Sequence, residues 1–306
     1  MPPSMTPQEL RGRFGGVVAF PVTPFKADLS LDLEGLRKNL AHLAKFPFCA
    51  VVAAGGTGEM YSLTPDEHRQ VVSATVECFA GTQIPVIAGV GFNQALAVEL
   101  AKQSAAAGAS GILALPPYFP GAPDDGMLEY YKAIGAATPL GMLVYSRDWV
   151  AYGPAQVEKL CNAIPTLVAW KDGQGDIRRY QAIRQRLGDR LYWIGGIGDD
   201  CVPGYYAIGI RTYTSSIATV APKLSLELHR LAAAGEYGAL NRLMAEYVIP
   251  LYDFRSRKKG YEVTVMKVAM DLVGLTGGPV RPPLPQLRPE ETEELRAMMK
   301  AWAAYL

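Results

Sequence analysis

Leu167-Val168-Ala169-Trp170-Lys171-Asp172 places a lysine directly after four apolar residues. Such a run is typical of a strand that is buried on both faces, as the strands of a parallel sheet are. A lysine at the end of this strand would be desolvated and would lose its charge readily, and a neutral amine can form a Schiff base with a carbonyl. The alternative is an ordinary surface lysine in a strand-to-helix loop, which is the commoner case.

Seven other short apolar runs lie at spacings suited to strand-helix units. The expected strands are 16–20, 49–53, 84–88, 111–115, 140–145, 167–170, 191–194 and 211–214. Helical patterns separate them at 33–45, 65–79, 94–107, 125–137, 154–163, 176–187 and 201–208. Eight such units predict a (β/α)₈ TIM barrel, which needs about 250 residues. A doubly wound open sheet is less favoured, because Phe20-Pro21-Val22-Thr23-Pro24-Phe25 lacks the glycine-rich turn expected after its first strand.

The pattern after the eighth strand is purely helical, at 223–234, 237–254, 263–273 and 290–305. We therefore expect a catalytic barrel over residues 1–222 and a C-terminal helical region, 223–306, packed on it. A stretch rich in glycine and proline, 277–285, separates the last two helices, since it cannot continue either of them.

The composition favours a small-molecule enzyme over a protein that binds nucleic acid or membranes. The net charge is +1 over 306 residues, and the one basic cluster, Arg255-Ser256-Arg257-Lys258-Lys259, is interpreted as the solvated start of a helix. Residues 1–13 lack the apolar centre of a signal peptide, and no membrane span is expected. The scattered cysteines, Cys49, Cys78, Cys161 and Cys201, indicate a reducing cytoplasm and no zinc site.

Catalytic groups of TIM barrels lie at the C-terminal ends of the strands. After the second strand, Gly55-Gly56-Thr57-Gly58-Glu59 offers backbone N–H groups that could hold a carboxylate or phosphate. A plain glycine turn is an equal alternative. Thr57 could bind the anion or relay a proton, whereas Glu59 is expected to tie the loop to a neighbouring backbone.

Tyr145 ends the strand before that of Lys171, and neighbouring strands lie roughly 5 Å apart. The phenol could therefore pass protons to and from an imine, although an aromatic cap on the barrel is the simpler interpretation. His42, His68 and His229 all fall in expected helices, which argues against histidine acid catalysis. No acidic or histidine cluster at the strand ends has metal-ligand spacing, so neither a metal nor a cofactor is expected.

These motifs resemble the dihydrodipicolinate synthase / N-acetylneuraminate lyase family of Schiff-base lyases, over nearly the whole chain. Gly56 replaces the first of that family's two threonines, and Val150 stands where a dihydrodipicolinate synthase has an arginine. The departures resemble one branch, the 5-dehydro-4-deoxyglucarate dehydratases. That similarity extends to Leu115-Pro116-Pro117-Tyr118, to 171–176 and to Gly278-Pro279-Val280-Arg281-Pro282-Pro283-Leu284.

The resemblance implies a decarboxylating dehydratase that converts 5-dehydro-4-deoxy-D-glucarate to 2,5-dioxopentanoate, with Lys171, Tyr145 and Thr57 catalytic. The keto-acid carboxylate is expected at the glycine box. The second carboxylate or the hydroxyls are expected at Arg147 or one of the later polar residues, although a surface salt bridge from Arg147 to Asp148 is equally possible. The full set of expected substrate contacts is Gly55, Gly56, Gly58, Tyr118, Ser146, Arg147, Gly196, Ser215, Ser216 and Arg281.

Two other functions are also compatible with the sequence. One is a dihydrodipicolinate synthase-like enzyme or an aldolase of the same family, which forms or cleaves a C–C bond on a 2-keto sugar acid. The other is a barrel that binds ligands without catalysis, against which the presence of both Lys171 and Tyr145 argues. The family also implies a homo-oligomer, a dimer of dimers, with the loop of Pro117 and Tyr118 near a subunit boundary.

Overall fold

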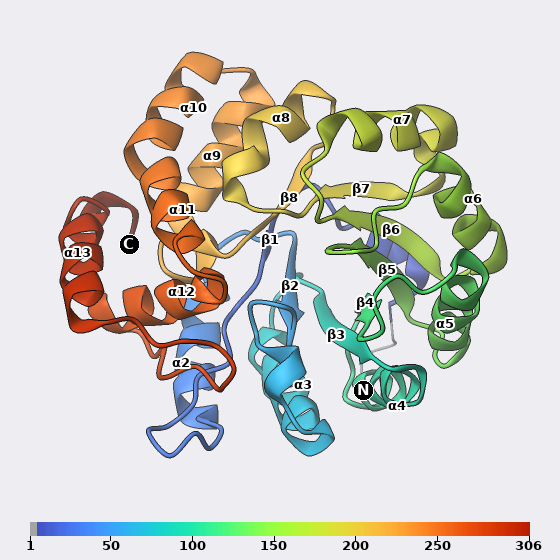
Figure 1. The fold of residues 1–306 in the computed structure, drawn as a ribbon, viewed down its shortest axis with the longest axis horizontal. Helices are drawn as coiled ribbons and strands as arrows, with labels where there is room; N and C mark the ends of the chain where they lie inside the picture. Colours follow the sequence, from blue (N-terminus) through green and yellow to red (C-terminus); the bar gives the residue numbers. More distant parts are fainter. Residues whose placement is uncertain (1–4) are drawn as a thin grey trace.

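The computed structural model describes residues 5–306, in which eight parallel strands close into a barrel (Figure 1). Each strand pairs with the next along the chain and β1 pairs with β8, so the predicted (β/α)₈ barrel is confirmed. The strands are β1 (Gly16–Ala19), β2 (Ala50–Ala53), β3 (Val86–Phe92), β4 (Gly111–Pro117), β5 (Gly141–Ser146), β6 (Leu167–Asp172), β7 (Tyr192–Gly195) and β8 (Thr212–Ser215).

A helix follows each strand and covers the outside of the barrel (Figure 1). These helices are α2 (Leu33–Leu43), α3 (Pro65–Phe79), α4 (Gln94–Ala106), α5 (Asp124–Ala136), α6 (Pro154–Ala163), α7 (Ile177–Leu187), α8 (Val202–Ala207) and α9 (Pro222–Ala234). Because α9 packs on β1 and α8, it is the eighth helix of the ring. The expected division at residue 222 assigns α9 to the C-terminal region. In the structure, the helices that lie outside the ring begin only after α9.

The C-terminal helices are α10 (Tyr237–Leu243), α11 (Ile249–Ser256), α12 (Tyr261–Leu272) and α13 (Pro289–Lys300). A π-helical segment, Met244–Val248, joins α10 to α11 where one continuous helix was predicted. The N–H of Ile249 donates to the carbonyl of Met244, and Pro250, which has no N–H, comes directly after. Single 3-10 turns occur at Met60–Ser62, Gly188–Arg190, Asp199–Cys201, Ile217–Thr219 and Ala303–Tyr305.

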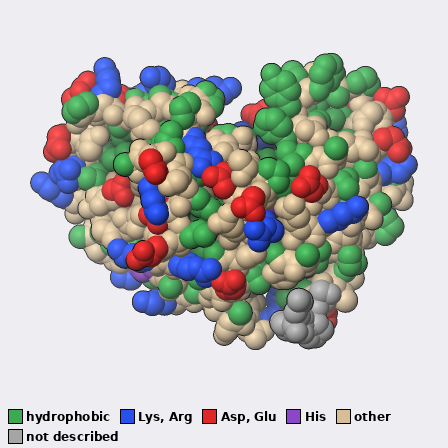
Figure 2. Space-filling view, turned by 90° about the horizontal axis from the view of Figure 1, so that it is seen from below, with side chains coloured by type: hydrophobic (Ala, Val, Ile, Leu, Met, Phe, Trp, Pro, Cys, Tyr) green, Lys and Arg blue, Asp and Glu red, His purple; other side chains and the backbone are tan. Residues whose placement is uncertain are grey.

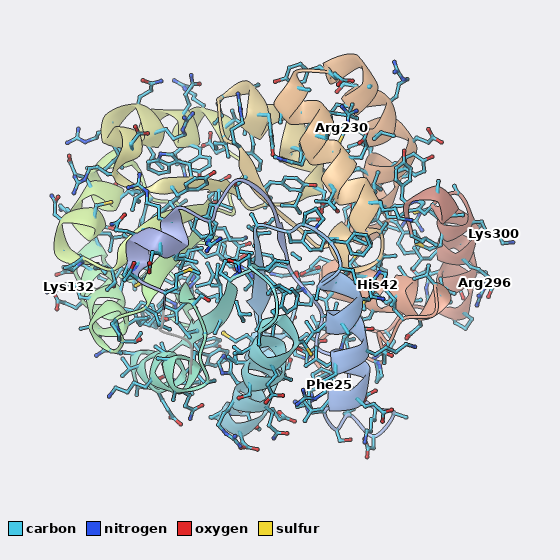
Figure 3. All side chains as sticks on the ribbon, turned by 180° about the vertical axis from the view of Figure 1, so that it is seen from behind. Phe25, His42, Lys132, Arg230, Arg296 and Lys300 are labelled. Carbon is cyan, nitrogen blue, oxygen red and sulfur yellow. The ribbon has the colours of Figure 1, made fainter. Side chains whose placement is uncertain are left out.

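A short helix that the sequence pattern does not reveal, α1 (Pro7–Arg11), contacts β5 and β6 and lies across the end of the barrel in the view from behind (Figure 3). Thr6 and Glu9 form a capping box at its start. Leu10 is fully buried, and a Cβ at Gly111 would lie 2.4 Å from Leu10 Cδ2. The barrel is thus plugged at the end opposite the C-terminal ends of its strands.

Alternation along the strands divides the core into two layers. Val52, Ile87 and Val168 belong to a cluster that fills the barrel, whereas Val51 and Ala88 belong to the layer beneath the helices. Both layers are apolar, which explains why the strands appear in the sequence as continuous hydrophobic runs.

Strand β3 continues four residues beyond its predicted end, through Gly89 and Gly91 to Phe92. Glycine is a poor strand former, but at Gly89 a Cβ would lie 2.2 Å from the carbonyl oxygen of Ala54. The missing side chain lets the loop after β2, which carries the glycine box, lie directly against β3.

Candidate active site

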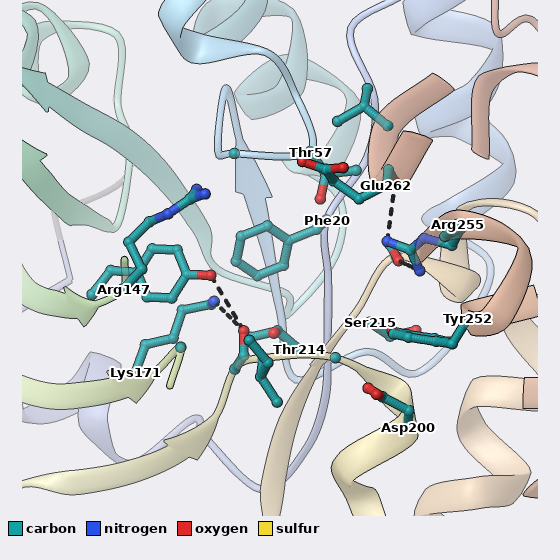
Figure 4. Close-up of a pocket in the computed structure, with 18 of the residues that line it drawn as sticks. Phe20, Thr57, Arg147, Lys171, Asp200, Thr214, Ser215, Tyr252, Arg255 and Glu262 are labelled. Carbon is teal, nitrogen blue, oxygen red and sulfur yellow. Dashed lines mark hydrogen bonds between the residues drawn. The ribbon is translucent and has the colours of Figure 1, made fainter. Parts of the chain in front are cut away.

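A cavity of about 410 Å³ opens at the C-terminal ends of the strands, between the barrel and the C-terminal helices (Figure 4). Three basic residues line it, namely Arg147, Lys171 and Arg255. Lys171 and Arg147 lie at one side of the view and Arg255 at the other, with Phe20 and Thr57 between them.

The Lys171 amine is almost completely buried. Its side chain is 3% exposed, and its Nζ donates to the carbonyl of Gly196 at 2.6 Å. The Nζ also lies 3.3 Å from the centroid of the Tyr145 ring and 5.2 Å from that of Phe20. Burial lowers the pKa of Lys171 well below its ordinary value, and the nearby charge of Arg147 lowers it further. The amine is therefore disposed to be neutral and nucleophilic.

Tyr145 lies beside Lys171 because β5 and β6 pair with these two residues in register. The Tyr145 hydroxyl donates to the Gly196 carbonyl at 3.4 Å, so phenol and amine share one acceptor. Burial raises the pKa of Tyr145, which keeps the phenol protonated and able to donate. The predicted convergence of the two side chains is confirmed.

The glycine box contributes two of its residues to the cavity wall, Gly56 and Thr57. Gly55 and Gly58 lie behind them: a Cβ at Gly55 would lie 3.0 Å from the Phe20 ring, and one at Gly58 would lie 3.1 Å from Ala54 Cα. These two glycines were expected to contact substrate, and instead they allow the loop to pack.

Glu59, the last residue of the box, is completely buried and ties the loop to the C-terminal region. It lies 2.5 Å from Lys267 Nζ and accepts from the backbone N–H of Arg281 at 3.2 Å. Burial raises the pKa of Glu59 and lowers that of Lys267, while their mutual attraction opposes both shifts. The expected structural role of Glu59 is confirmed by these contacts.

Arg147 combines the two interpretations that the sequence left open. It lines the cavity, and its Nε donates to Asp148 at 2.7 Å. A Cβ at Gly56 would lie 3.0 Å from Arg147 Nη1, so the glycine leaves room for the guanidinium. Ser146 does not line the cavity, because its hydroxyl is buried and donates to the carbonyl of Val150 at 2.7 Å.

Two expected contacts lie away from the cavity. Arg281 forms an ion pair with Glu67 at 2.5 Å and donates to the carbonyls of Leu29 and Ser62. That hydrogen bonding lowers the pKa of Glu67 to about 2, so the guanidinium is fully engaged in holding the loops together. Tyr118 is 79% exposed and stacks on Phe92 with 6.0 Å between ring centroids.

The expected residues at the C-terminal ends of β7 and β8 do reach the cavity. Gly196, Ser215 and Ser216 all line it. The Ser215 hydroxyl is already bonded to Asp199 and to Ser225, whereas the Ser216 hydroxyl accepts from Arg255 Nη1 at 3.0 Å.

Sequence reasoning missed a buried network that fixes the Gly196 carbonyl. Asp172 accepts from the Tyr205 hydroxyl at 2.7 Å, and that hydroxyl accepts in turn from the N–H groups of Gly196 and Ile197. Asp172 directly follows Lys171, so its place beside the lysine was visible in the sequence. Tyr205, on α8, carried no comparable signal.

Arg255 was also missed, since its basic cluster was interpreted as a solvated helix start. The cluster instead lies at the C-terminal end of α11, and Arg255 turns inward to line the cavity with Tyr252. Charges of both signs are interspersed over the face in Figure 2, in keeping with the near-neutral net charge. Within residues 5–306, no helix is both long and apolar enough to cross a membrane, and no cluster of three potential metal ligands occurs.

Comparison with known proteins places this geometry in a family. The chain is 39% identical over 299 residues to a probable 5-dehydro-4-deoxyglucarate dehydratase from Bradyrhizobium diazoefficiens, covering 97% of this chain and 95% of the relative. It is 40% identical to a protein of the same name from Rhodococcus opacus, covering 96% and 98%.

Among solved structures, a dihydrodipicolinate synthase from Oceanobacillus iheyensis superposes with a TM-score of 0.90 at 27% identity, covering 97% of this chain and 99% of that one. Residues 13–302 match the model of the Dihydrodipicolinate synthetase family. The chain therefore belongs to the dihydrodipicolinate synthetase family.

Proposed function

We propose that this protein is a Schiff-base lyase that dehydrates and decarboxylates 5-dehydro-4-deoxy-D-glucarate to 2,5-dioxopentanoate. The observation that carries the proposal is the buried amine of Lys171, which faces a cavity beside the Tyr145 phenol. The substrate is taken from the names of relatives that cover nearly the whole chain.

The first step would be attack of Lys171 Nζ on the ketone next to one carboxylate. The amine must be neutral to attack, and its burial favours that state. The ketone oxygen leaves as water once it is protonated, for which the Tyr145 phenol is well positioned. Gly56 and Thr57 would hold the keto-acid carboxylate with backbone and hydroxyl donors.

The imine then acidifies the adjacent CH₂, because the resulting carbanion is delocalised into C=N. Loss of a proton there expels the β-hydroxyl as water and leaves a conjugated imine. Breaking the C–C bond to the distal carboxylate releases CO₂, and its electron pair flows through the conjugated system to the imine nitrogen. Hydrolysis frees Lys171 and the five-carbon product, so one water and one CO₂ are lost overall.

The test is reduction of the imine in place. The protein is incubated with the keto-deoxy-glucarate and borohydride, and the adduct is located by mass spectrometry. We expect it on Lys171 and expect Lys171→Ala to abolish both adduct and CO₂ release. Lys267 is also buried but does not line the cavity, which makes it an internal control. An adduct on Lys267, or release of pyruvate without CO₂ as an aldolase would give, contradicts the proposal.

We further propose that the chain forms a homo-oligomer, built as a dimer of dimers, in the cytoplasm. The aromatic side chains of Phe92, Tyr118 and Phe119 are exposed at neighbouring strand ends, where a second subunit could cover them. The four cysteines are free, as a reducing compartment requires. Light scattering would test the assembly, and a monomeric mass at micromolar concentration would contradict it.

A further inference from the structure

A dicarboxylate substrate needs an anion site at each end of the cavity, and the two guanidinium groups there are not equivalent. Arg147 lies next to the glycine box, since a Cβ at Gly56 would lie 3.0 Å from its Nη1. It also lies over the Tyr145 ring, with 5.4 Å from Cζ to the ring centroid. Arg147 therefore belongs to the end of the cavity where imine chemistry takes place, and its charge is already paired with Asp148.

Arg255 enters the cavity from the opposite side, on α11 (Figure 4). Its hydrogen bonds go to neutral acceptors, the Ser216 hydroxyl and the Glu262 carbonyl, each at 3.0 Å. In the part of the chain that the structure describes, it has no carboxylate within salt-bridge distance, and its buried Nε has no hydrogen-bond partner. By contrast, Arg147 in the cavity is paired with Asp148, and Arg281 outside it is paired with Glu67.

The guanidinium of Arg255 is held in one orientation. It lies over the Tyr252 ring, 4.5 Å from the centroid, and the Tyr252 hydroxyl is itself fixed by Asp199, donating to its carboxylate at 3.0 Å. The charge of Arg255 opposes the rise in pKa that burial causes at Asp199 and Asp200, but neither carboxylate forms an ion pair with it. A planar cation that is stacked, hydrogen-bonded through both terminal nitrogens and not engaged in a direct ion pair is prepared for a carboxylate. The π-helical segment before α11 supports this placement, because one extra residue in a turn rotates the following helix by about 100°.

We propose that Arg255 binds the distal carboxylate of the substrate and so selects six-carbon keto dicarboxylates over shorter keto acids. The inference rests on the proposed function, since it assumes that Lys171 forms the imine at the other end. Arg255 acts on binding and on specificity, and it takes no part in imine formation itself.

The experiment uses two keto acids that form an imine but cannot complete the reaction. Pyruvate carries only the keto-acid end, and 2-oxoadipate is the substrate skeleton without its hydroxyls. Apparent dissociation constants come from the yield of borohydride-reduced adduct against keto-acid concentration. We expect Arg255→Met to raise the constant for 2-oxoadipate roughly 10- to 100-fold and to leave that for pyruvate within about twofold. Arg255→Lys keeps the charge but loses the two-pronged guanidinium, so its dissociation constant for 2-oxoadipate should lie between those of the native protein and Arg255→Met.

Arg147→Met is the matched variant at the other end, and it should weaken both keto acids together. If Arg147→Met alone removes the preference for 2-oxoadipate, the second anion site is Arg147 and the proposal is overturned. Equal weakening of pyruvate and 2-oxoadipate by Arg255→Met would also overturn it, because Arg255 would then act on the fold or the imine. A native protein that traps neither keto acid would instead refute the Schiff-base function on which the inference depends.

Discussion

Replacing Lys267 by Met should cost about 3–5 kcal/mol of the free energy of unfolding, the usual cost of leaving one buried charge without its partner. The side chains of Lys267 and Glu59 are 1% and 0% exposed, and their charged atoms lie 2.5 Å apart. Met replaces the aliphatic part of the lysine, so packing against the Phe25 ring is largely kept. The loss then reflects the ion pair together with the hydrogen bond that Lys267 Nζ donates to the Pro279 carbonyl at 2.8 Å. Glu59 would keep only the N–H of Arg281.

The loss of unfolding free energy in Lys267→Met should depend on pH, and the sign of that dependence follows from Glu59. Burial already raises the pKa of Glu59 above its ordinary 4.5, and loss of Lys267 removes the attraction that opposes this rise. A group whose pKa is raised in the folded state favours folding at low pH and loses that contribution as the pH increases. The gap between native protein and Lys267→Met should therefore be larger at pH 8 than at pH 5.

Urea denaturation at both pH values and one fixed protein concentration measures these differences. The double variant Glu59→Gln with Lys267→Met should recover most of the loss, because Gln still accepts from Arg281 without a charge. The control is Arg37→Met, which breaks an ion pair whose side chains are 47% and 59% exposed and should cost less than about 1 kcal/mol. A deficit that is the same at both pH values and persists in the double variant would refute the electrostatic reasoning.

Three further predictions concern the cavity. Tyr145→Phe should slow imine formation by roughly 10²- to 10⁴-fold in single-turnover trapping while Lys171 remains reactive, and an unchanged rate would remove the phenol from the proton transfer. Arg147→Met should raise the pKa of Lys171, because it removes a repelling charge. The acidic limb of the pH profile for pyruvate trapping should therefore move to higher pH. Gly56→Thr should move that limb in the same direction by displacing the guanidinium, and a limb that stays in place would show that Arg147 tolerates the side chain.

The barrel was predictable from sequence because its strands are covered on both faces, so each one is a continuous apolar run between helical patterns. The same physics gave Lys171 and Tyr145, since strand ends in a closed parallel barrel share one rim and neighbouring strands bring their last residues together. Strand β3 was predicted to end too early, because Gly89 and Gly91 were not expected inside a strand. Glycine is needed at Gly89 because the carbonyl of Ala54 lies against it, and only the folded loop brings that carbonyl near. Local pattern cannot report such a contact.

The remaining errors concern charged residues whose partners are distant in sequence. Arg281 was expected at the substrate, yet Glu67, more than two hundred residues earlier, holds its guanidinium. Arg255 was interpreted as solvated, because a basic cluster usually is, and the π-helical segment that precedes its helix has no clear sequence signature. The role of an arginine depends on which carboxylate, if any, lies beside it in the folded protein, and only the tertiary structure determines that.

The C-terminal helices therefore shape the cavity as well as packing on the barrel. Lys267 on α12 holds the glycine box through Glu59, so the position of Thr57 depends on a helix outside the ring. Arg255 on α11 forms the wall opposite Lys171. In the proposed mechanism, the barrel strands supply the amine and the phenol, which any 2-keto acid could use, and the C-terminal helices set the distance to the second carboxylate. Substitutions on α11 should thus change which keto acids are accepted, and substitutions at the ends of β5 and β6 should change how fast any of them reacts.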